Sequence, residues 1–456
     1  MTRQQPPQQL HYRVTSLAAG LAKGNPVAAG ARLDGAEGST PSVLCALGGK
    51  ILRIESREPD YNITIAVNDA PPSPHSDNWL PLLPPIAPAT IGGHANPREL
   101  LLSRIAEAGI CGLGGGRFPS AAKLAAPTQT TPLIINAMQS EPDNDSDLWL
   151  VREDPTGVAD GVALTAIGCA AQSVIIAIPK TNQVAEATKT QLKKALDLAF
   201  DRFDWQGECR LKTLPVNPAS GAETLLARAA AGLAVGLHQP LHQIGALSVN
   251  LATAYAIGRA VLGGEPLLRR VVTIAGEPRW VWLGTPIVDL IDGPCMLNGR
   301  IGGKFSGDNA RLADALDAVD AVDAGHFCIT PIANLTSYPC INCSRCRPVC
   351  PAELHPDLLH KTLLEGLREP GVIDKANQLN VDRCIECGAC NAVCPSDIFL
   401  AQQFREARSV CAHDAALASA ADNAKVRVDA RNARLARADE QRDAARRERE
   451  QTARDW

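Results

Sequence analysis

Short runs of β-type residues separated by glycine-rich turns characterise the first part of the chain. Such runs lie at 42–47, 51–55 and 62–67. Runs of this length bounded by turn residues predict strands. We therefore expect a small β module over 26–67, followed by an extended connector over the proline-rich stretch 69–93.

Helical and strand patterns alternate in the region that follows. A helix is expected to begin after Asn96, which can cap it with Glu99 three residues later, and to end at Gly109. Beyond it, the pattern predicts a strand at 133–137 and an amphipathic helix at 183–198. This alternation favours an α/β layer with a largely parallel sheet.

The most apolar window of the chain, 158–178, is long enough to cross a bilayer, which takes about 20 residues. It contains Asp160, however, and it divides into an alanine-rich helix at 159–171 and a buried strand at 173–178. A membrane span is the alternative, but the pattern favours a helix and a strand of a soluble core.

Composition narrows the classes of function. The chain has 456 residues, a formal net charge of −4 and 4% aromatic residues, so neither charge nor stacking surfaces favour nucleic acid as a partner. Its first ten residues lack the apolar stretch of a secretory signal. In such a chain, clustered cysteines are expected to bind metal rather than to form disulfides, and this chain has 15 cysteines.

Eight of the cysteines form two motifs with the same spacing, Cys-x2-Cys-x2-Cys-x3-Cys-Pro. This is the run of bacterial two-cluster ferredoxins, in which the fourth cysteine of each motif ligates the other cluster. One predicted [4Fe–4S] cluster is therefore held by Cys340, Cys343, Cys346 and Cys394. The other predicted cluster is held by Cys350, Cys384, Cys387 and Cys390.

Two alternatives to iron–sulfur clusters stay open at this point. Cys-x2-Cys pairs also make tetrahedral zinc sites, and buried thiols can be inert. A third cysteine two residues further on and the Cys-Pro ending do not suit zinc. The remaining cysteines lack such spacing and are expected to be plain thiols: Cys45, Cys111, Cys169, Cys209, Cys295, Cys328 and Cys411.

A glycine-rich stretch, Gly112-Leu-Gly-Gly-Gly-Arg117, can bring backbone N–H groups close to a phosphate or a flat ring system. It is not the dinucleotide fingerprint, because Arg117 stands where the last glycine is required, and it follows a helix rather than a strand. Taken alone, the stretch is equally compatible with a flexible loop.

Further motifs surround this stretch in a fixed order. They are Gly109–Leu124, Leu133–Ala137, Ser140–Pro142, Ser220–Glu223, Asn250–Ile257, Gly264–Gly276, Leu283–Pro286 and the two cysteine motifs. Together they resemble the C subunit of Rnf-type electron transport complexes (RnfC, also called RsxC), over about residues 20–410.

The resemblance implies a multidomain α/β protein. Its parts would be a leader (1–19), a barrel-sandwich module with the proline-rich connector (20–90), and an α/β domain like the flavin- and NADH-binding subunit of respiratory complex I (91–265). A β-grasp ligand-binding module (266–330), a dicluster ferredoxin-like α+β domain (331–411) and a tail (412–456) would follow. The charged tail favours helix but has no apolar stripe to bury, so we expect a solvated helix or a disordered segment, with a docking arm as the alternative.

The resemblance also implies a function. The chain would be the peripheral electron-transfer subunit of an ion-translocating oxidoreductase complex, on the cytoplasmic face of the bacterial inner membrane and without a transmembrane helix of its own. Its cofactors would be FMN, NAD(H) and the two clusters. Its partners would be the other subunits of the complex, including a ferredoxin-like subunit and integral membrane subunits.

The residues of the flavin site follow from the same resemblance. Gly114, Gly115 and Gly116, with Lys123, would cradle the phosphate and ring of FMN. Asn136 and Glu141 would lie beside the flavin and the nicotinamide, and Asn250 and Thr253 would close on the FMN phosphate. Glu141 and Lys123 are the expected catalytic residues.

Three stretches depart from the family pattern. The usual GLGGAGFPT has Arg117 and Ser120 at its last glycine and threonine; a usual acid and tyrosine are replaced by Gln139 and Asp143; and the usual GGPMMG reads GGKFSG at 302–307. Arg117 could obstruct a flavin or supply a charge for its phosphate. Two alternatives therefore stay open: a relay or scaffold subunit with a decayed flavin pocket, and a reductase component that controls a redox-sensor protein.

Overall fold

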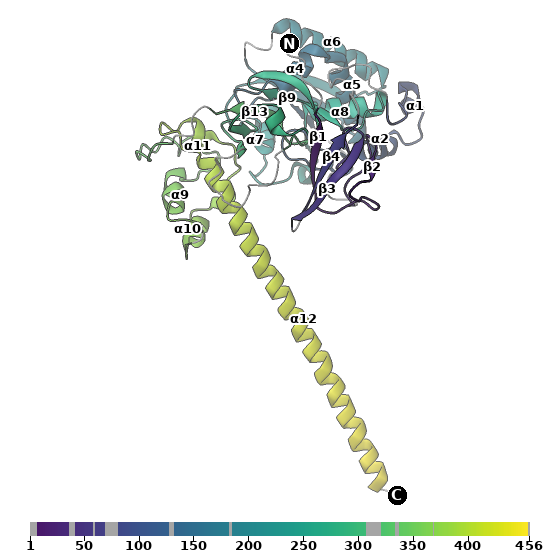
Figure 1. Cartoon of the computed structure of the whole chain (residues 1–456), viewed down its shortest axis with the longest axis vertical. Helices are drawn as coiled ribbons and strands as arrows, with labels where there is room; N and C mark the ends of the chain where they lie inside the picture. The colour runs from purple at the N-terminus through teal and green to yellow at the C-terminus, as the bar shows by residue number, and fades with distance from the viewer. Residues whose placement is uncertain are drawn as a thin grey trace. The chain divides into compact units, whose positions relative to one another are not determined.

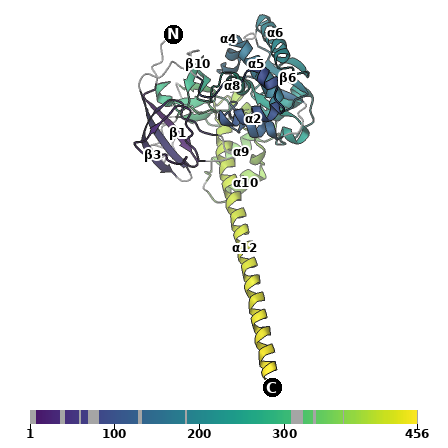
Figure 2. The ribbon, with the colours of Figure 1, turned by 90° about the vertical axis from the view of Figure 1, so that its right-hand side faces the viewer.

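The computed structural model describes residues 7–35, 42–57, 60–68, 81–126, 132–181, 185–306, 321–332, 337–367 and 369–454. They form two compact units, one of residues 1–353 and 385–402, the other of residues 354–384 and 403–456. Figure 1 labels many of the elements of both units, and Figure 2 shows the same ribbon turned by 90°.

A four-stranded parallel sheet in the order β7-β6-β5-β8 forms the centre of the first unit. Its strands are β5 (Leu133–Asn136), β6 (Ser173–Pro179), β7 (Glu208–Leu214) and β8 (Leu247–Asn250). The chain builds outward from β5 to β7 and then returns to pair β8 with the free side of β5. The strand order therefore reverses between β5 and β8, which in open α/β sheets is the place where ligands bind.

Helices cover both faces of this sheet. Figure 2 shows α2, α5 and α6, which share one face, near β6. Leu133 and Ile135 pack in one core with α2 (Pro97–Glu107), α5 (Pro155–Gly168), α6 (Glu186–Arg202) and α8 (Leu251–Leu262). Ile134, pointing the other way, packs in a second core with α7 (Glu223–Ala231). Because both faces are buried, β5 and β6 are continuous apolar runs rather than alternating ones.

Two glycines set the contact between α5 and α8. A Cβ built on Gly161 would lie 2.1 Å from the carbonyl oxygen of Ala254, and one on Gly258 would lie 3.0 Å from the Cα of Gly161. The two helix backbones thus meet directly, without side chains between them. This contact fixes α8, whose first turn borders the switch between β5 and β8.

Several local expectations are confirmed. The side chain of Asn96 accepts a hydrogen bond from the Glu99 N–H, as a cap of α2 does. The apolar window 158–178 divides into α5 and β6, as the pattern predicts. Among the described residues, no helix combines the length and apolar character that crossing a bilayer requires.

An antiparallel sheet, β1-β4-β3-β2, forms the N-terminal module. Its strands are β1 (Gln9–Val14), β2 (Pro26–Val27), β3 (Gly49–Arg57) and β4 (Asp60–Val67). The expected leader 1–19 is corrected here, because residues 9–14 form β1 and pair with β4. The run 42–47 is not a strand and makes one isolated bridge at Leu44. Of the connector, 69–80 lies outside the described residues.

A mixed five-stranded sheet, β10-β9-β13-β11-β12, completes the strands of the first unit. Its strands are β9 (Arg269–Ile274), β10 (Glu277–Trp282), β11 (Cys295–Leu297), β12 (Lys304–Ser306) and β13 (Cys328–Pro331). Trp282 packs in the core of the N-terminal sheet. The Tyr12 hydroxyl also donates to the Leu283 carbonyl over 3.0 Å, so the two sheets are joined by packing and by hydrogen bonding.

The remaining described elements are short, apart from one. In the first unit they are α1 (Pro88–Gly92), α3 (Ser120–Ala125), α4 (Ser146–Glu153), η1 (Leu241–Ile244), η2 (Ile287–Asp289) and α11 (Ala389–Ala392). The second unit holds α9 (Pro356–Leu363), α10 (Val372–Gln378), η3 (Val381–Arg383) and most of α12 (Leu400–Arg454). Beyond residue 412, nearly every described side chain of α12 is exposed, so the tail is a solvated helix, one of the two states expected for it (Figure 1).

The glycine contact between α5 and α8 gives a stability prediction. Gly161→Ala places a methyl group against the Ala254 carbonyl oxygen, and we expect it to lower the free energy of unfolding by about 2–3 kcal/mol. Gly92→Ala, at the end of α1 with nothing within 4 Å of its Cβ, is the control and should change stability by less than about 1 kcal/mol. Urea denaturation followed by circular dichroism measures both. Equal stability of the two variants would contradict the direct contact of the helices.

Candidate functional site

A cavity of about 280 Å³ lies where the strand order reverses. Its walls come from the glycine loop, from α3, from Asn136 at the end of β5, and from Ser248 to Asn250 at the end of β8. Segments more than 100 residues apart in the chain meet here because β5 and β8 are hydrogen-bonded neighbours. The topology, rather than any single motif, creates this pocket.

Most of the residues that the sequence analysis selected for the flavin site line this one cavity. They are Gly114, Gly116, Lys123, Asn136, Asn250 and Thr253. Gly115 does not line it: its φ is +102° and the nearest atom to a Cβ there belongs to Phe327, at 3.7 Å. Glu141 does not line it either, which differs from the expected place beside the flavin and nicotinamide.

The edge of the cavity at β8 is held by an internal network. The Asn250 side chain caps α8 by accepting from the Thr253 N–H, and it donates to the Asp147 carboxylate over 2.7 Å. The Thr253 hydroxyl oxygen accepts from the Leu113 N–H over 2.9 Å, which ties the glycine loop to α8. Burial raises the pKa of Asp147 to about 6. Asn250 and Thr253 thus position the loop.

Lys123 is the cation of the cavity. Its ammonium lies 2.8 Å from the Glu223 carboxylate, and both side chains are partly exposed at the cavity wall. Glu223 stands in the first turn of α7, where a carboxylate is favoured by the helix dipole. The sequence analysis quoted Glu223 as part of a motif but assigned no role to it. The structure makes it the partner that sets the position of the Lys123 ammonium.

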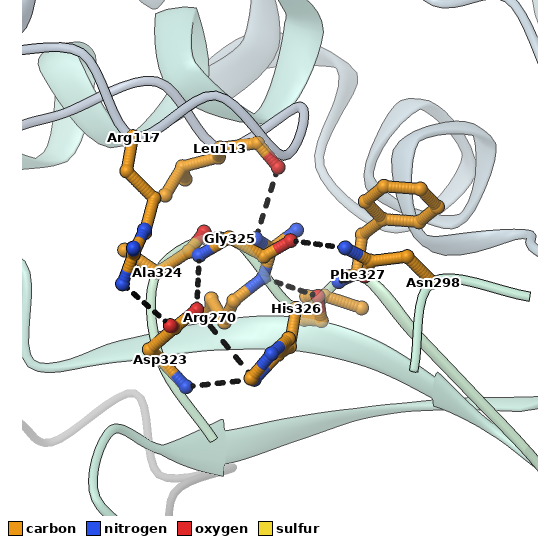
Figure 3. Close-up of polar contacts among 10 residues, drawn as sticks. Leu113, Arg117, Arg270, Asn298, Asp323, Ala324, Gly325, His326 and Phe327 are labelled. Atoms are coloured by element: carbon orange, nitrogen blue, oxygen red, sulfur yellow. Dashed lines mark hydrogen bonds and ion pairs between the residues drawn. The ribbon is translucent and has the colours of Figure 1, made fainter. Parts of the chain in front are cut away.

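The Arg117 side chain points toward Asp323, as Figure 3 shows, and it is not among the residues that line the cavity. Its guanidinium pairs with the Asp323 carboxylate over 2.7 Å, and Asp323 also accepts from the Gly325 N–H. The backbone of Arg117 is in the left-handed region, with φ of +50°, where glycine is usual. The substitution therefore does not obstruct the cavity and instead links the glycine loop to residues 323–325.

A buried arginine supports the other side of the glycine loop (Figure 3). Arg270 is 2% exposed and donates to the carbonyl oxygens of Leu113 and Ala324. Burial lowers its pKa to about 10, and the charges of Asp147 and Asp323 oppose that shift. Arg270, which belongs to β9, thus holds the glycine loop against that strand.

Glu141 lies outside the cavity and is buried, with 4% of the residue exposed. Its carboxylate accepts hydrogen bonds from the backbone N–H groups of Ile301, over 2.9 Å, and Gly302, over 2.5 Å. Burial raises its pKa to about 7, and the two N–H donors oppose that shift. Glu141 therefore anchors the loop 299–303 instead of reaching into the cavity.

The two cysteine motifs repeat one backbone conformation, 44 residues apart. Left-handed residues stand at equivalent places: Asn342, Ser344 and Glu353 in the first motif, and Glu386, Gly388 and Asp397 in the second. Such residues reverse the chain between cysteines. Among the described residues, no three His, Cys, Asp or Glu side chains are gathered closely enough to hold a metal ion. The assignment of cysteines to clusters thus stays a prediction.

Comparison with known families places these features in context. Residues 105–259 match the model of the Nuo51 FMN-binding domain, and residues 339–399 match that of the 4Fe-4S dicluster domain. The C subunit of the ion-translocating oxidoreductase complex of Actinobacillus succinogenes is 33% identical over 378 residues, 79% of this chain and 50% of the relative. That of Edwardsiella ictaluri is 34% identical over 361 residues, 74% of this chain and 42% of the relative.

The chain is thus similar to RnfC, the C subunit of these complexes, over about three quarters of its own length. It spans about half the length of the curated relatives it matches. A solved NAD+-reducing [NiFe]-hydrogenase is a weaker likeness, with a TM-score of 0.49 and 15% identity over 70% of this chain and 64% of that one. The family models confirm the expected FMN-binding and dicluster domains.

The residues present fit both kinds of cofactor. At the cavity, a Cβ on Gly114 would lie 3.2 Å from Asn250, and nothing lies within 4 Å of one on Gly116, so the glycines leave room for a flat, phosphate-bearing group beside Lys123. In the motifs, eight thiols provide four ligands for each of two cubanes. The cavity and the donor set thus suit FMN and two [4Fe–4S] clusters.

Three residues that shape the site escaped the sequence analysis: Asp147, Arg270 and Asp323. Each acts on residues distant in the chain, with Arg117 and Asp323 separated by 206 positions. No local pattern marks such partners. Only Arg270 lay within a motif that the resemblance quoted.

Two substitutions test the direction of the Arg117 side chain. Gly114→Ala narrows the gap to Asn250 and should weaken FMN binding about tenfold, whereas Arg117→Gly should change it less than about threefold, because that side chain lies outside the cavity. The loss of the partly exposed Arg117–Asp323 pair should cost under about 1 kcal/mol of stability. Quenching of FMN fluorescence measures the affinities. A large gain in affinity for Arg117→Gly would show that the arginine does obstruct the pocket.

Glu141 gives a pH prediction. Its pKa is raised from 4.5 to about 7 in the folded chain, so the folded state binds the proton more tightly than the unfolded state does. The free energy of unfolding should therefore fall as pH rises from about 4.5 to about 7, with a contribution from this group of about 3 kcal/mol. Glu141→Gln should flatten the profile by that amount. Glu107→Gln, on the exposed side of α2, should leave it parallel to the wild type in urea denaturation across this range.

Proposed function

We propose that this chain is the peripheral electron-transfer subunit of an ion-translocating membrane oxidoreductase complex. It would pass electrons between NAD(H) and FMN at the cavity and membrane partners, through two [4Fe–4S] clusters. One observation supports this best: a single chain has both a cavity where the strand order of the parallel sheet reverses and eight cysteines with the spacing of a two-cluster ferredoxin. The name of the relatives, which describes an ion-translocating complex, supports the setting.

The residues of the cavity have distinct roles in this proposal. FMN held there would supply the conversion between transfer of two electrons as one hydride and transfer of single electrons. The backbone N–H groups of Gly114 and Gly116 are available for close approach, and Lys123 supplies positive charge for a phosphate. Asn250 and Thr253 hold the loop in place, and Arg270 supports it from beneath. The chain's contribution is to bind and orient.

A second function is favoured by one specific observation. Glu141, the remaining acid of its motif, lies outside the cavity, and Gln139 replaces the other acid. A protein of this family that does not bind NADH would act as a relay or scaffold, with clusters but no hydride chemistry. Because the cavity is open and the Arg117 side chain lies outside it, we favour the electron-entry function.

The proposal includes finer assignments. The antiparallel N-terminal sheet, which includes β1, supports a barrel-sandwich module, and the five-stranded sheet supports a β-grasp module at 266–330. The cluster motifs support a ferredoxin-like domain at 331–411. The partners would be a ferredoxin-like subunit and integral membrane subunits, with the chain at the cytoplasmic face of a bacterial inner membrane.

Reconstitution separates the two functions. After anaerobic loading with iron, sulfide and FMN, we expect about eight Fe per chain and flavin bleaching by NADH, followed by EPR signals of reduced clusters. Gly114→Ala should need about tenfold more FMN for the same flavin response and should keep the iron. Intact clusters with no flavin uptake and no response to NADH would establish the relay. Zinc instead of iron would contradict both functions.

A further inference from the structure

The two cysteine motifs share a backbone conformation but not an environment. In the first motif Ile341, Cys343 and Arg345 are exposed. At the equivalent positions of the second motif, Ile385 and Cys387 are half-buried and Ala389 is buried. The two isoleucines occupy the same place in the repeat, yet Ile341 is 65% exposed whereas Ile385 is half-buried.

A loop from the body of the first unit covers the second motif. A Cβ on Gly388, whose φ is +70°, would lie 2.2 Å from the Ile301 carbonyl oxygen, so only glycine fits there. The Asn391 side chain donates to the same carbonyl over 2.8 Å, and Gln402 donates to the Gly303 carbonyl over 2.8 Å. The first motif has Ser344 where the second has Gly388.

This covering loop is tied to the α/β domain. Glu141 accepts from the N–H groups of Ile301 and Gly302, and a Cβ on Gly302 would meet both Glu141 and the Glu386 carbonyl oxygen within 3.4 Å. An apolar cavity of about 570 Å³ also lies between the end of β7 and residues next to Cys350, Cys390 and Cys394. Two of these three cysteines belong to the second predicted cluster. The loop 299–303 thus joins the second motif, rather than the first, to the α/β domain.

Charge distinguishes the two motifs as well. Residues 337–349 carry two arginines, Arg345 and Arg347, and no carboxylate. The equivalent residues 381–393 carry Arg383, Asp382 and Glu386, a net charge of −1. Beside the first motif, Tyr338 is 62% and Ile341 65% exposed. Exposed aromatic and aliphatic side chains with arginine are the composition of protein interfaces.

We propose that an acidic one-electron carrier protein docks on the face formed by Tyr338, Ile341 and Arg345, and that the first-motif cluster is the outer and the second-motif cluster the inner of the two. This rests on the proposed function, since it requires both clusters. One electron crosses the interface, and no bond forms or breaks. The cluster loses the electron that the oxidised carrier gains, or the reverse.

The test uses the full reconstituted chain reduced with dithionite, so that it does not depend on NADH. Oxidation by an acidic [2Fe–2S] ferredoxin is followed by stopped-flow absorbance. Arg345→Glu should slow it about threefold or more at low salt, with the effect lost at high salt. Oxidation by the cationic tris(phenanthroline)cobalt(III) should become faster. Arg383→Glu, the same charge change beside the second motif, is the matched control and should leave both rates nearly unchanged.

A second variant tests the apolar part of the face, because a change of charge can also act at long range. Ile341→Ala should raise the carrier concentration that gives half of the maximal rate several-fold. The rate with the cobalt complex should stay unchanged, because only a protein partner uses the apolar contact. Equal effects of Arg345→Glu and Arg383→Glu, or an effect of Arg383→Glu alone, would overturn the proposal. Such a result in a chain with its full iron content would refute only the docking face. A chain that takes up no iron refutes the proposed function and this inference together.

Discussion

The pairing of β8 with β5 is the interaction on which the candidate site depends. It places Asn136 and Asn250 side by side at the carboxyl ends of two parallel strands. From there Asn250 caps α8 and binds Asp147, and Thr253 holds the glycine loop. Loss of this pairing would remove one wall of the cavity and the anchor of its glycines. A sheet with the same strands in sequential order would have neither.

The loop 299–303 has a comparable role between the α/β domain and the second cysteine motif. Its backbone N–H groups bind the Glu141 carboxylate, and its carbonyl groups accept from Asn391 and Gln402. A backbone can serve two neighbours at once in this way because its donors and acceptors point in opposite directions. Side-chain contacts would be less rigid, since each would add rotamer freedom.

Local features of the sequence were sufficient for many of the elements but not for the site. The cap at Asn96 and the division of the window 158–178 depend on neighbouring residues, and both were predicted. The strand β1 was missed although Leu10, Tyr12 and Val14 alternate with polar residues, because a single short strand resembles a loose terminus. The directions of Arg117 and Glu141 could not be predicted, because each is set by a partner more than 150 residues away.

The repeated cysteine motifs also show how a sequence repeat can become committed to one orientation. Both copies have the same turns, yet Gly388 lies against the Ile301 carbonyl oxygen at the place where the first copy carries Ser344. Exchanging residues 337–349 with 381–393 would press a serine against the Ile301 carbonyl oxygen and bury an arginine at the place of Ala389. The two copies are alike in backbone and spacing, but they are no longer interchangeable parts.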